Sequence, residues 1–168
     1  MAPFHVPFPS ELRNGLWHTT HPLRFDLIRI SGAIVANPKL PESERWKTTQ
    51  GAAYYPFVRT LNAISLFDFT DFEPDKYSNE YPLSTWWTFV PCRRDWDSSI
   101  WIEIDRALIE ASFVPARQII AMWNERRAYR HTVMPIVEAA STEPIPITAF
   151  RRVLCWERSP GAFREIRF

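Results

Sequence analysis

The stretch IIAMWNERRAYRHTVMPIVEA, residues 119–139, joins an apolar start, a basic centre and a second apolar run. Its first apolar residues recur at helical spacing, which together with the preceding Pro115 predicts a helix from that proline to about Arg130. The β-branched residues of 133–137 predict a short strand entered from a turn. We therefore expect a helix and a strand joined by a basic segment, with the rest of the chain arranged around them.

The basic centre of this stretch places four cationic or titratable side chains within a little over one helical turn: Arg126, Arg127, Arg130 and His131. Cations near the end of a helix complement its dipole, by ~0.3–1 kcal/mol each. Arginines also fork onto the phosphate oxygens of a nucleotide or of a nucleic-acid backbone. The residues support both interpretations, and only the second makes this surface a binding site.

A pair of carboxylates lies on a second well-defined segment. Glu103 and Asp105 are two residues apart in SIWIEID, residues 99–105, which is a predicted strand, so both side chains should leave the same face. Two such carboxylates can hold Mg²⁺ for phosphodiester hydrolysis, with Asp95 or Asp97 as further ligands. The other interpretation is the solvated polar face of an antiparallel sheet.

Alternation of apolar and polar residues predicts further short strands, separated by turn residues. We expect strands at 23–30, 32–37, 84–90, 99–105, 145–157 and 163–168, with a short helix within 38–50. Strands outnumber helices and do not alternate with them, which favours an α+β fold with a mixed or antiparallel sheet and a few helices. The proline-rich residues 1–22 predict an extended N-terminal arm, and residues 23–168 a single domain.

The composition is that of a chain that folds. Its 168 residues, 46% hydrophobic and 15% aromatic, suit one domain with an ample core. Two cysteines without CxxC spacing predict a reducing, cytoplasmic setting. Because no signal-peptide pattern and no run near ~20 apolar residues is found, we expect no integral membrane segment, and any membrane contact would be peripheral.

Several common sites are excluded or disfavoured by the motifs. The chain has four glycines, and none belongs to GxxxxGK[ST] or GxGxxG, which excludes a standard phosphate loop or dinucleotide fold. His18 and His21 have ligand-like spacing but no partner pair, so we expect ordinary loop residues rather than a zinc site. The tryptophans can either fill the core or stack nucleic-acid bases; the candidates are Trp86, Trp87, Trp96, Trp101 and Trp156.

The central stretch resembles the signature of the ParB/sulfiredoxin superfamily, in which an IIAG-like strand end meets a helix opening ERRxRA. The matching segments are IIA at 119–121, NERR at 124–127, AYRH at 128–131 and MPIV at 134–137. This chain departs from the pattern by inserting Met122-Trp123 and by carrying Asn124 where the family has glycine. Most of the chain also resembles the plasmid fertility inhibition factors of the Osa type, through residues 84–105 and the closing RSPGAFREIRF at 158–168.

The second resemblance implies a cytoplasmic ParB/sulfiredoxin-like domain, peripheral at the inner membrane, that blocks conjugative DNA transfer through a type IV secretion system, T-DNA-type transfer included. It further implies ATP hydrolysis and Mg²⁺-dependent cleavage of the transferred DNA strand. Carried onto this chain, the catalytic residues would be Glu125, Arg126, Arg127, Arg130 and His131. ATP would contact Asn124, Arg127 and Arg130, and Glu103 and Asp105 would hold Mg²⁺.

Two other functions remain open at this point. One is a non-catalytic inhibitor that binds a coupling protein or a transferred protein substrate of the secretion system through exposed aromatic residues. The other is plain nucleic-acid binding, for which the net charge of +1 argues against a broad basic face but not against a local one.

Overall fold

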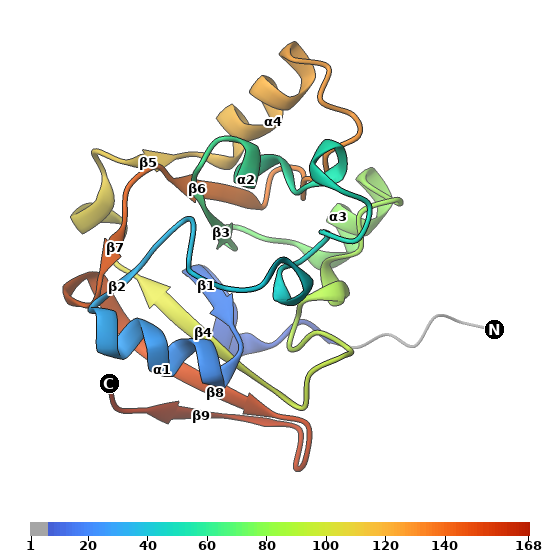
Figure 1. Cartoon of the computed structure of the whole chain (residues 1–168). Coiled ribbons are helices and arrows are strands. Elements are labelled where there is room, and N and C mark those ends of the chain that lie inside the picture. The colour runs from blue at the N-terminus through green and yellow to red at the C-terminus, as the bar shows by residue number, and fades with distance from the viewer. Residues whose placement is uncertain (1–6) are drawn as a thin grey trace.

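A seven-stranded sheet, in the order β5-β6-β3-β1-β4-β8-β9, organises residues 7–168, which the computed structural model describes (Figure 1). All of its strand pairs are antiparallel. A two-stranded sheet, β2-β7, and four α-helices complete an α+β domain within these residues, which confirms the fold class. The strands are β1 Leu16–Thr20, β2 Ala33–Ile34, β3 Ile64–Asp68, β4 Ser98–Ile104, β5 Phe113–Val114, β6 Glu138–Ser141, β7 Ile145–Pro146, β8 Phe150–Glu157 and β9 Ala162–Ile166. The helices are α1 Pro22–Ser31, α2 Phe57–Thr60, α3 Pro74–Glu80 and α4 Ala116–Glu125.

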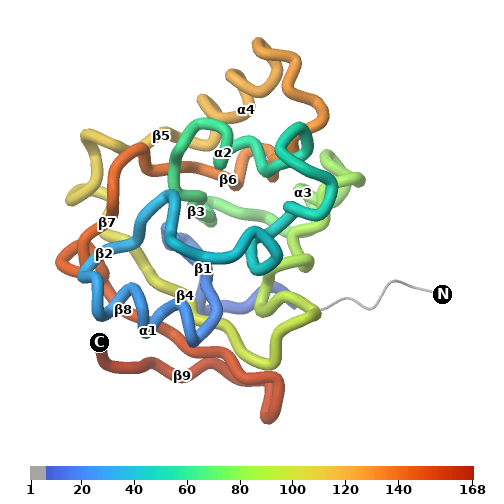
Figure 2. Tube along the Cα trace, in the orientation of Figure 1, coloured from blue at the N-terminus to red at the C-terminus, as the bar shows by residue number. Residues whose placement is uncertain are grey.

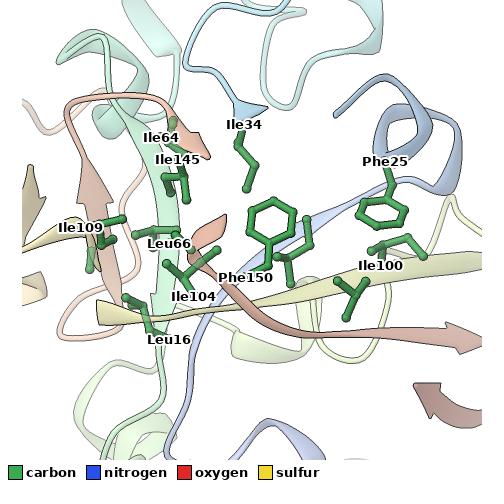
Figure 3. Close-up of a cluster of buried hydrophobic side chains, with 14 of the residues drawn as sticks. Leu16, Phe25, Ile34, Ile64, Leu66, Ile100, Ile104, Ile109, Ile145 and Phe150 are labelled. Carbon is green, nitrogen blue, oxygen red and sulfur yellow. The ribbon is translucent and has the colours of Figure 1, made fainter. Parts of the chain in front are cut away.

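The two faces of the sheet bury different kinds of side chain. One face packs mostly aliphatic residues, drawn in Figure 3 together with Phe25 and Phe150, against α1 and the small sheet. The other face packs aromatic residues, among them Trp17 and Trp101, whose rings lie 6.5 Å apart, centre to centre. Alternation along β4 accounts for the division, because Ile100 and Ile102 join the aliphatic cluster while Trp101 joins the aromatic one.

The segment 23–30, predicted to be a strand, is the helix α1, so that prediction was wrong. Its ends explain the difference: His21 caps the N-terminus by accepting a hydrogen bond from the Leu23 N–H at 3.2 Å, and Pro22 occupies the first turn. Gly32, with φ 82°, ends the helix in the left-handed conformation. A strand would place Leu23 and Phe25 on the same face, but Leu23 is exposed and Phe25 is buried.

The prediction of an extended arm over residues 1–22 is also wrong in part, because Leu16–Thr20 is the strand β1 in the middle of the sheet. Residues 1–6 lie outside the described part of the chain. His18, expected in a loop, therefore lies on a central strand, and His21 is a helix cap.

Other segments also differ from expectation. Residues 84–90 form a 3-10 turn, Trp86–Thr88, and residues 38–50 contain only the 3-10 turn Glu42–Glu44. Residues 133–137 are a loop with a left-handed Ile136, and the strand β6 begins directly after it. The strand at 99–105 is confirmed as β4, but β4 pairs with β1 and β8 rather than with the segment 84–90. The C-terminal hairpin is confirmed as β8–β9. The predicted strand 145–157 is interrupted by the 3-10 turn Ile147–Ala149, so that its first residues form β7 in the small sheet.

Candidate functional site

A fork between two central strands opens a concavity in the sheet. Strands β1 and β3 pair only at Leu16↔Asp68 and Trp17↔Phe67, and beyond this point each strand pairs with its other neighbour alone. The His18 ring takes the place of the missing ladder bond, with its Nδ1 3.0 Å from the backbone oxygen of Ser65. The sheet therefore opens on one side of His18.

A cleft of about 810 Å³ occupies this opening. Residues 35–56, which we call the cover segment, run from β2 to α2 in front of the sheet (Figures 1 and 2), and several of them line the cleft. Apolar side chains from the fork, from β2 and from the cover segment supply much of the lining, including Ile64, Ile34 and Leu40. The volume is that of a typical small-molecule pocket.

Positive charge dominates the lining of the cleft among the described residues. Five cationic side chains are set against one carboxylate: Arg24, Arg45, Lys47, Arg59 and Arg93, with Glu138. A cleft with low-dielectric walls and one sign of charge concentrates the field, which favours an anionic ligand.

Arg59 is the least satisfied of these cations. Its guanidinium carbon lies 3.8 Å from the centre of the Tyr55 ring, and its Nη2 donates to both carboxylate oxygens of Glu42, at 2.7 and 2.9 Å. Its Nη1 is buried and has no hydrogen-bond partner in residues 7–168. A buried, unpaired donor costs about 1–3 kcal/mol, and more when charged, so a ligand that accepts from this nitrogen gains stability.

Arg93 and two tryptophans form one wall of the cleft. The guanidinium carbon of Arg93 lies 4.6 Å from the ring centres of both Trp46 and Trp96, and the group also donates to the Asp95 carboxylate at 3.0 and 2.5 Å. Both tryptophans line the cleft, so the two rings and the guanidinium between them give it a cationic, aromatic wall.

His18 and Glu138 are buried titratable groups in the lining of the cleft, at the part that we call its floor. A carbonyl oxygen only accepts, so the bond to Ser65 places the His18 proton on Nδ1 and leaves Nε2 as an acceptor; burial lowers its pKa and keeps the ring neutral. Glu138 accepts from the Ser65 hydroxyl at 2.8 Å and from the Met134 N–H at 3.0 Å, while burial raises its pKa.

The basic residues expected from the sequence lie around a separate hollow of about 620 Å³. Arg126, Arg127, Arg130 and His131 all line it, so the structure brings the four together. Asn124 and Glu125 do not line it, and the Asn124 side chain donates back to the Ile120 carbonyl at 3.1 Å. His131 lines both cavities, and its Nδ1 is 2.7 Å from the Tyr55 backbone oxygen, which ties the hollow to the cover segment.

The two carboxylates proposed for Mg²⁺ are engaged elsewhere. Glu103 accepts from Arg152 Nε at 2.6 Å, and Asp105 caps the turn Arg106–Ile109 through the Ala107 N–H at 3.1 Å. Neither lines the cleft or the hollow. Across residues 7–168, no three His, Cys, Asp or Glu side chains group together as a metal site would require. Glu103 and Asp105 therefore do not form a Mg²⁺ site.

Sequence reasoning missed the cleft residues because they come from segments far apart in the chain. His18 was set aside as a loop residue, and Arg24, Arg59 and Glu138 stand in no motif. The one available signal was the excess of arginine, with 20 Lys plus Arg residues of which few are lysine.

The fold and the site together define an α+β domain with a cationic, aromatic-walled cleft at a fork in its sheet. Comparisons with protein-family models, with curated proteins and with solved structures find no match. Within the described range, none of the helices has the length and apolar character needed to cross a membrane.

Proposed function

We propose that this protein binds a nucleoside phosphate in the cleft, either as a free nucleotide or as one unit of a single nucleic-acid strand. The observation that carries the proposal is Arg59, one of five cations that line the cleft, whose Nη1 is buried and unpaired within the described residues. Arginine is well suited to phosphate because its planar fork presents several donors. Trp46 and Trp96, which line the cleft on either side of Arg93, supply aromatic surface for the base.

The experiment compares ATP, adenosine and an oligothymidylate strand by calorimetry. The wild type should bind ATP more tightly than adenosine, and Arg59→Gln should weaken ATP binding about tenfold or more, because charge-assisted hydrogen bonds are lost. Arg29→Gln is the matched control, since Arg29 lies on α1, half exposed, with only a 3.8 Å contact to Asp26. Thermal melting of each variant confirms that it is folded.

The oligothymidylate arm distinguishes a free nucleotide from a strand. Tighter binding of the strand, with an affinity that falls steeply with salt, identifies nucleic acid as the source of the phosphate. Equal affinity for ATP and adenosine, or an Arg59→Gln variant that binds as the wild type does, overturns the proposal.

The resemblance to plasmid fertility inhibition factors supplies a biological setting for such a site. On that proposal the protein is cytoplasmic, adopts a ParB/sulfiredoxin-like fold, hydrolyses ATP and cuts the transferred DNA strand. The residues around the hollow, Arg126, Arg127, Arg130 and His131, would then contact the DNA backbone. Incubation with linear DNA and Mg²⁺ tests this: an Arg127→Ala variant that cuts as well as the parent rules out the hollow as the cleavage site.

One observation favours the non-catalytic alternative, in which the protein inhibits transfer by binding a coupling protein or a transferred protein substrate. Helix α1 exposes Leu23, Leu27 and Ile30, at 71%, 54% and 84%, along one side. Exposed apolar groups in such a row are typical of protein contacts. Under this alternative, Leu23→Ser with Ile30→Ser abolishes inhibition of transfer and leaves ATP affinity unchanged; under the enzymatic proposal inhibition persists.

A further inference from the structure

Glu42, on the cover segment, accepts hydrogen bonds from the guanidinium of Arg59, the group whose other nitrogen is unpaired. Besides Arg59, it accepts from the Tyr55 hydroxyl at 3.0 Å and lies 3.9 Å from the Arg45 guanidinium. Arg59 and Arg45 are largely buried, with 16% of each side chain exposed, whereas the Glu42 side chain is 56% exposed. The acceptor is therefore at the surface, whereas Arg59 and Arg45 line the cleft.

The carboxylate is poorly matched to the guanidinium that it contacts. Both of its bonds go to the same nitrogen, Nη2 of Arg59, so the pair is end-on rather than fork to fork. The neighbouring Nη1, which a matched acceptor would also engage, stays buried and unpaired. A phosphoryl group has three acceptor oxygens in a tetrahedral arrangement and can accept from both nitrogens at once.

The plane of the guanidinium is held in place before any ligand arrives. The Tyr55 ring lies 3.8 Å from its central carbon, and the Tyr55 backbone oxygen is in turn within 2.7 Å of His131 Nδ1. Arg45 is anchored separately, through Nη2 to the Ala36 carbonyl at 3.2 Å. Donors that are already fixed lose little freedom on binding, which favours a specific anion site.

We propose that Arg59 and Arg45, which line the cleft, form a phosphoryl subsite at its edge together with the adjoining Tyr55, and that Glu42 is the resident anion, which the phosphoryl group of the ligand displaces. The inference rests on the proposed nucleoside phosphate binding and deepens it by naming where the phosphate lies. Hydrogen bonding from Arg59 lowers the pKa of Glu42, so the resident group is charged at neutral pH and competes as an anion.

Displacement has a measurable signature in the affinity for phosphate-bearing ligands. Glu42→Gln removes the competing charge, and we expect it to bind ATP and inorganic phosphate about two- to fivefold more tightly than the wild type, the range typical of exposed ion pairs. Adenosine affinity should not change. Adding Arg59→Gln to Glu42→Gln should abolish the gain, because the gain needs the freed guanidinium.

Glu44→Gln is the matched control for net charge. Glu44 lies in the same 3-10 turn as Glu42 and loses the same charge, but its link to the cleft is its backbone oxygen, which accepts from Arg24. Tighter ATP binding by Glu42→Gln alone supports the subsite. An equal gain from Glu44→Gln shows a general field effect and overturns it.

Glu42→Asp keeps the test decisive if the glutamine variant does not fold. The shorter side chain keeps its charge but draws back from Arg59, so we expect it to gain affinity for ATP as well. A wild type that binds ATP, with Glu42→Gln and Glu42→Asp binding no more tightly, overturns the subsite alone. Absence of ATP and phosphate binding by wild type and variants alike overturns the proposed function with it.

Discussion

At the scale of single residues, Glu138 shows what burial does to a charge in the floor of the cleft. Only 8% of the residue is exposed, and its two oxygens accept from the Ser65 hydroxyl and the Met134 N–H. Burial raises its pKa, and these two bonds oppose the rise. The folded protein therefore holds this proton to a higher pH than the unfolded chain does.

The consequence for stability has a definite sign. Above the ordinary glutamate pKa of about 4.5 the folded state binds more protons at this site than the unfolded state, so the contribution of Glu138 falls as pH rises through the window up to the raised pKa. We predict that the free energy of unfolding of the wild type, minus that of Glu138→Gln, falls with pH in this window, by at most about 1.4 kcal/mol per pH unit.

Urea unfolding of both proteins at a series of pH values measures this difference. The neighbouring His18, whose pKa burial lowers, destabilises the fold as pH drops below about 6.5, but it titrates in both proteins and cancels in the comparison. A difference that is constant or rises with pH would contradict the assignment of Glu138.

The candidate site was only partly predictable at this scale. Arg126, Arg127, Arg130 and His131 are close in sequence, so their common surface could be predicted, and all four line one hollow. The cleft residues are brought together by strand pairing: His18 and Ser65 are 47 positions apart, and Ser65 and Glu138 are 73 apart. No local pattern contains such a pair.

At the scale of elements, the hydrogen bonds at the end of α4 define the conformation of the segment NERR, residues 124–127. The Arg127 N–H donates to the Asn124 carbonyl at 3.0 Å and the Ala128 N–H to the Trp123 carbonyl at 2.9 Å, the two bonds of a Schellman motif. The segment therefore closes a helix rather than opening one, and the predicted helix to Arg130 ends earlier, at Glu125.

This motif places Arg127 in a conformation that glycine usually occupies, with φ 48°. We predict that Arg127→Gly raises the free energy of unfolding by about 0.5–1 kcal/mol, because relief of left-handed strain exceeds the extra chain entropy of glycine. Arg126, one residue earlier, has an ordinary right-handed φ of −81°. Arg126→Gly should therefore destabilise, by about 0.5–1 kcal/mol.

Denaturant unfolding of the two variants checks this pair of opposite signs. If both glycine substitutions lower stability alike, Arg127 is not strained in solution and the helix does not end as described.

At the scale of the whole molecule, the sheet depends on β4, which pairs with β1 on one side and β8 on the other. Ile102 is fully buried at its centre, opposite His18 and Val153. We predict that Ile102→Ala lowers the free energy of unfolding by about 2–5 kcal/mol, through lost burial and the cavity left behind.

Leu108→Ala is the comparison, since Leu108 is 62% exposed and should change stability by about 0.5 kcal/mol or less. Thermal and urea unfolding of both variants measures the contrast. Equal effects would show that β4 does not lie at the centre of the core.

The sequence by itself determined what short-range patterns carry: the α+β class, the strand β4, the C-terminal hairpin and the basic run at 126–131. These follow from alternation, turn residues and neighbouring charges, which act over a few positions. Only the tertiary structure decided that β1 is central, that 22–31 is a helix, and that β1 and β3 part at Trp17↔Phe67 to open a cleft. The physical reason is that caps outweighed apparent alternation in α1, while the cleft arises from the pairing of strands remote in the chain, which no single segment encodes.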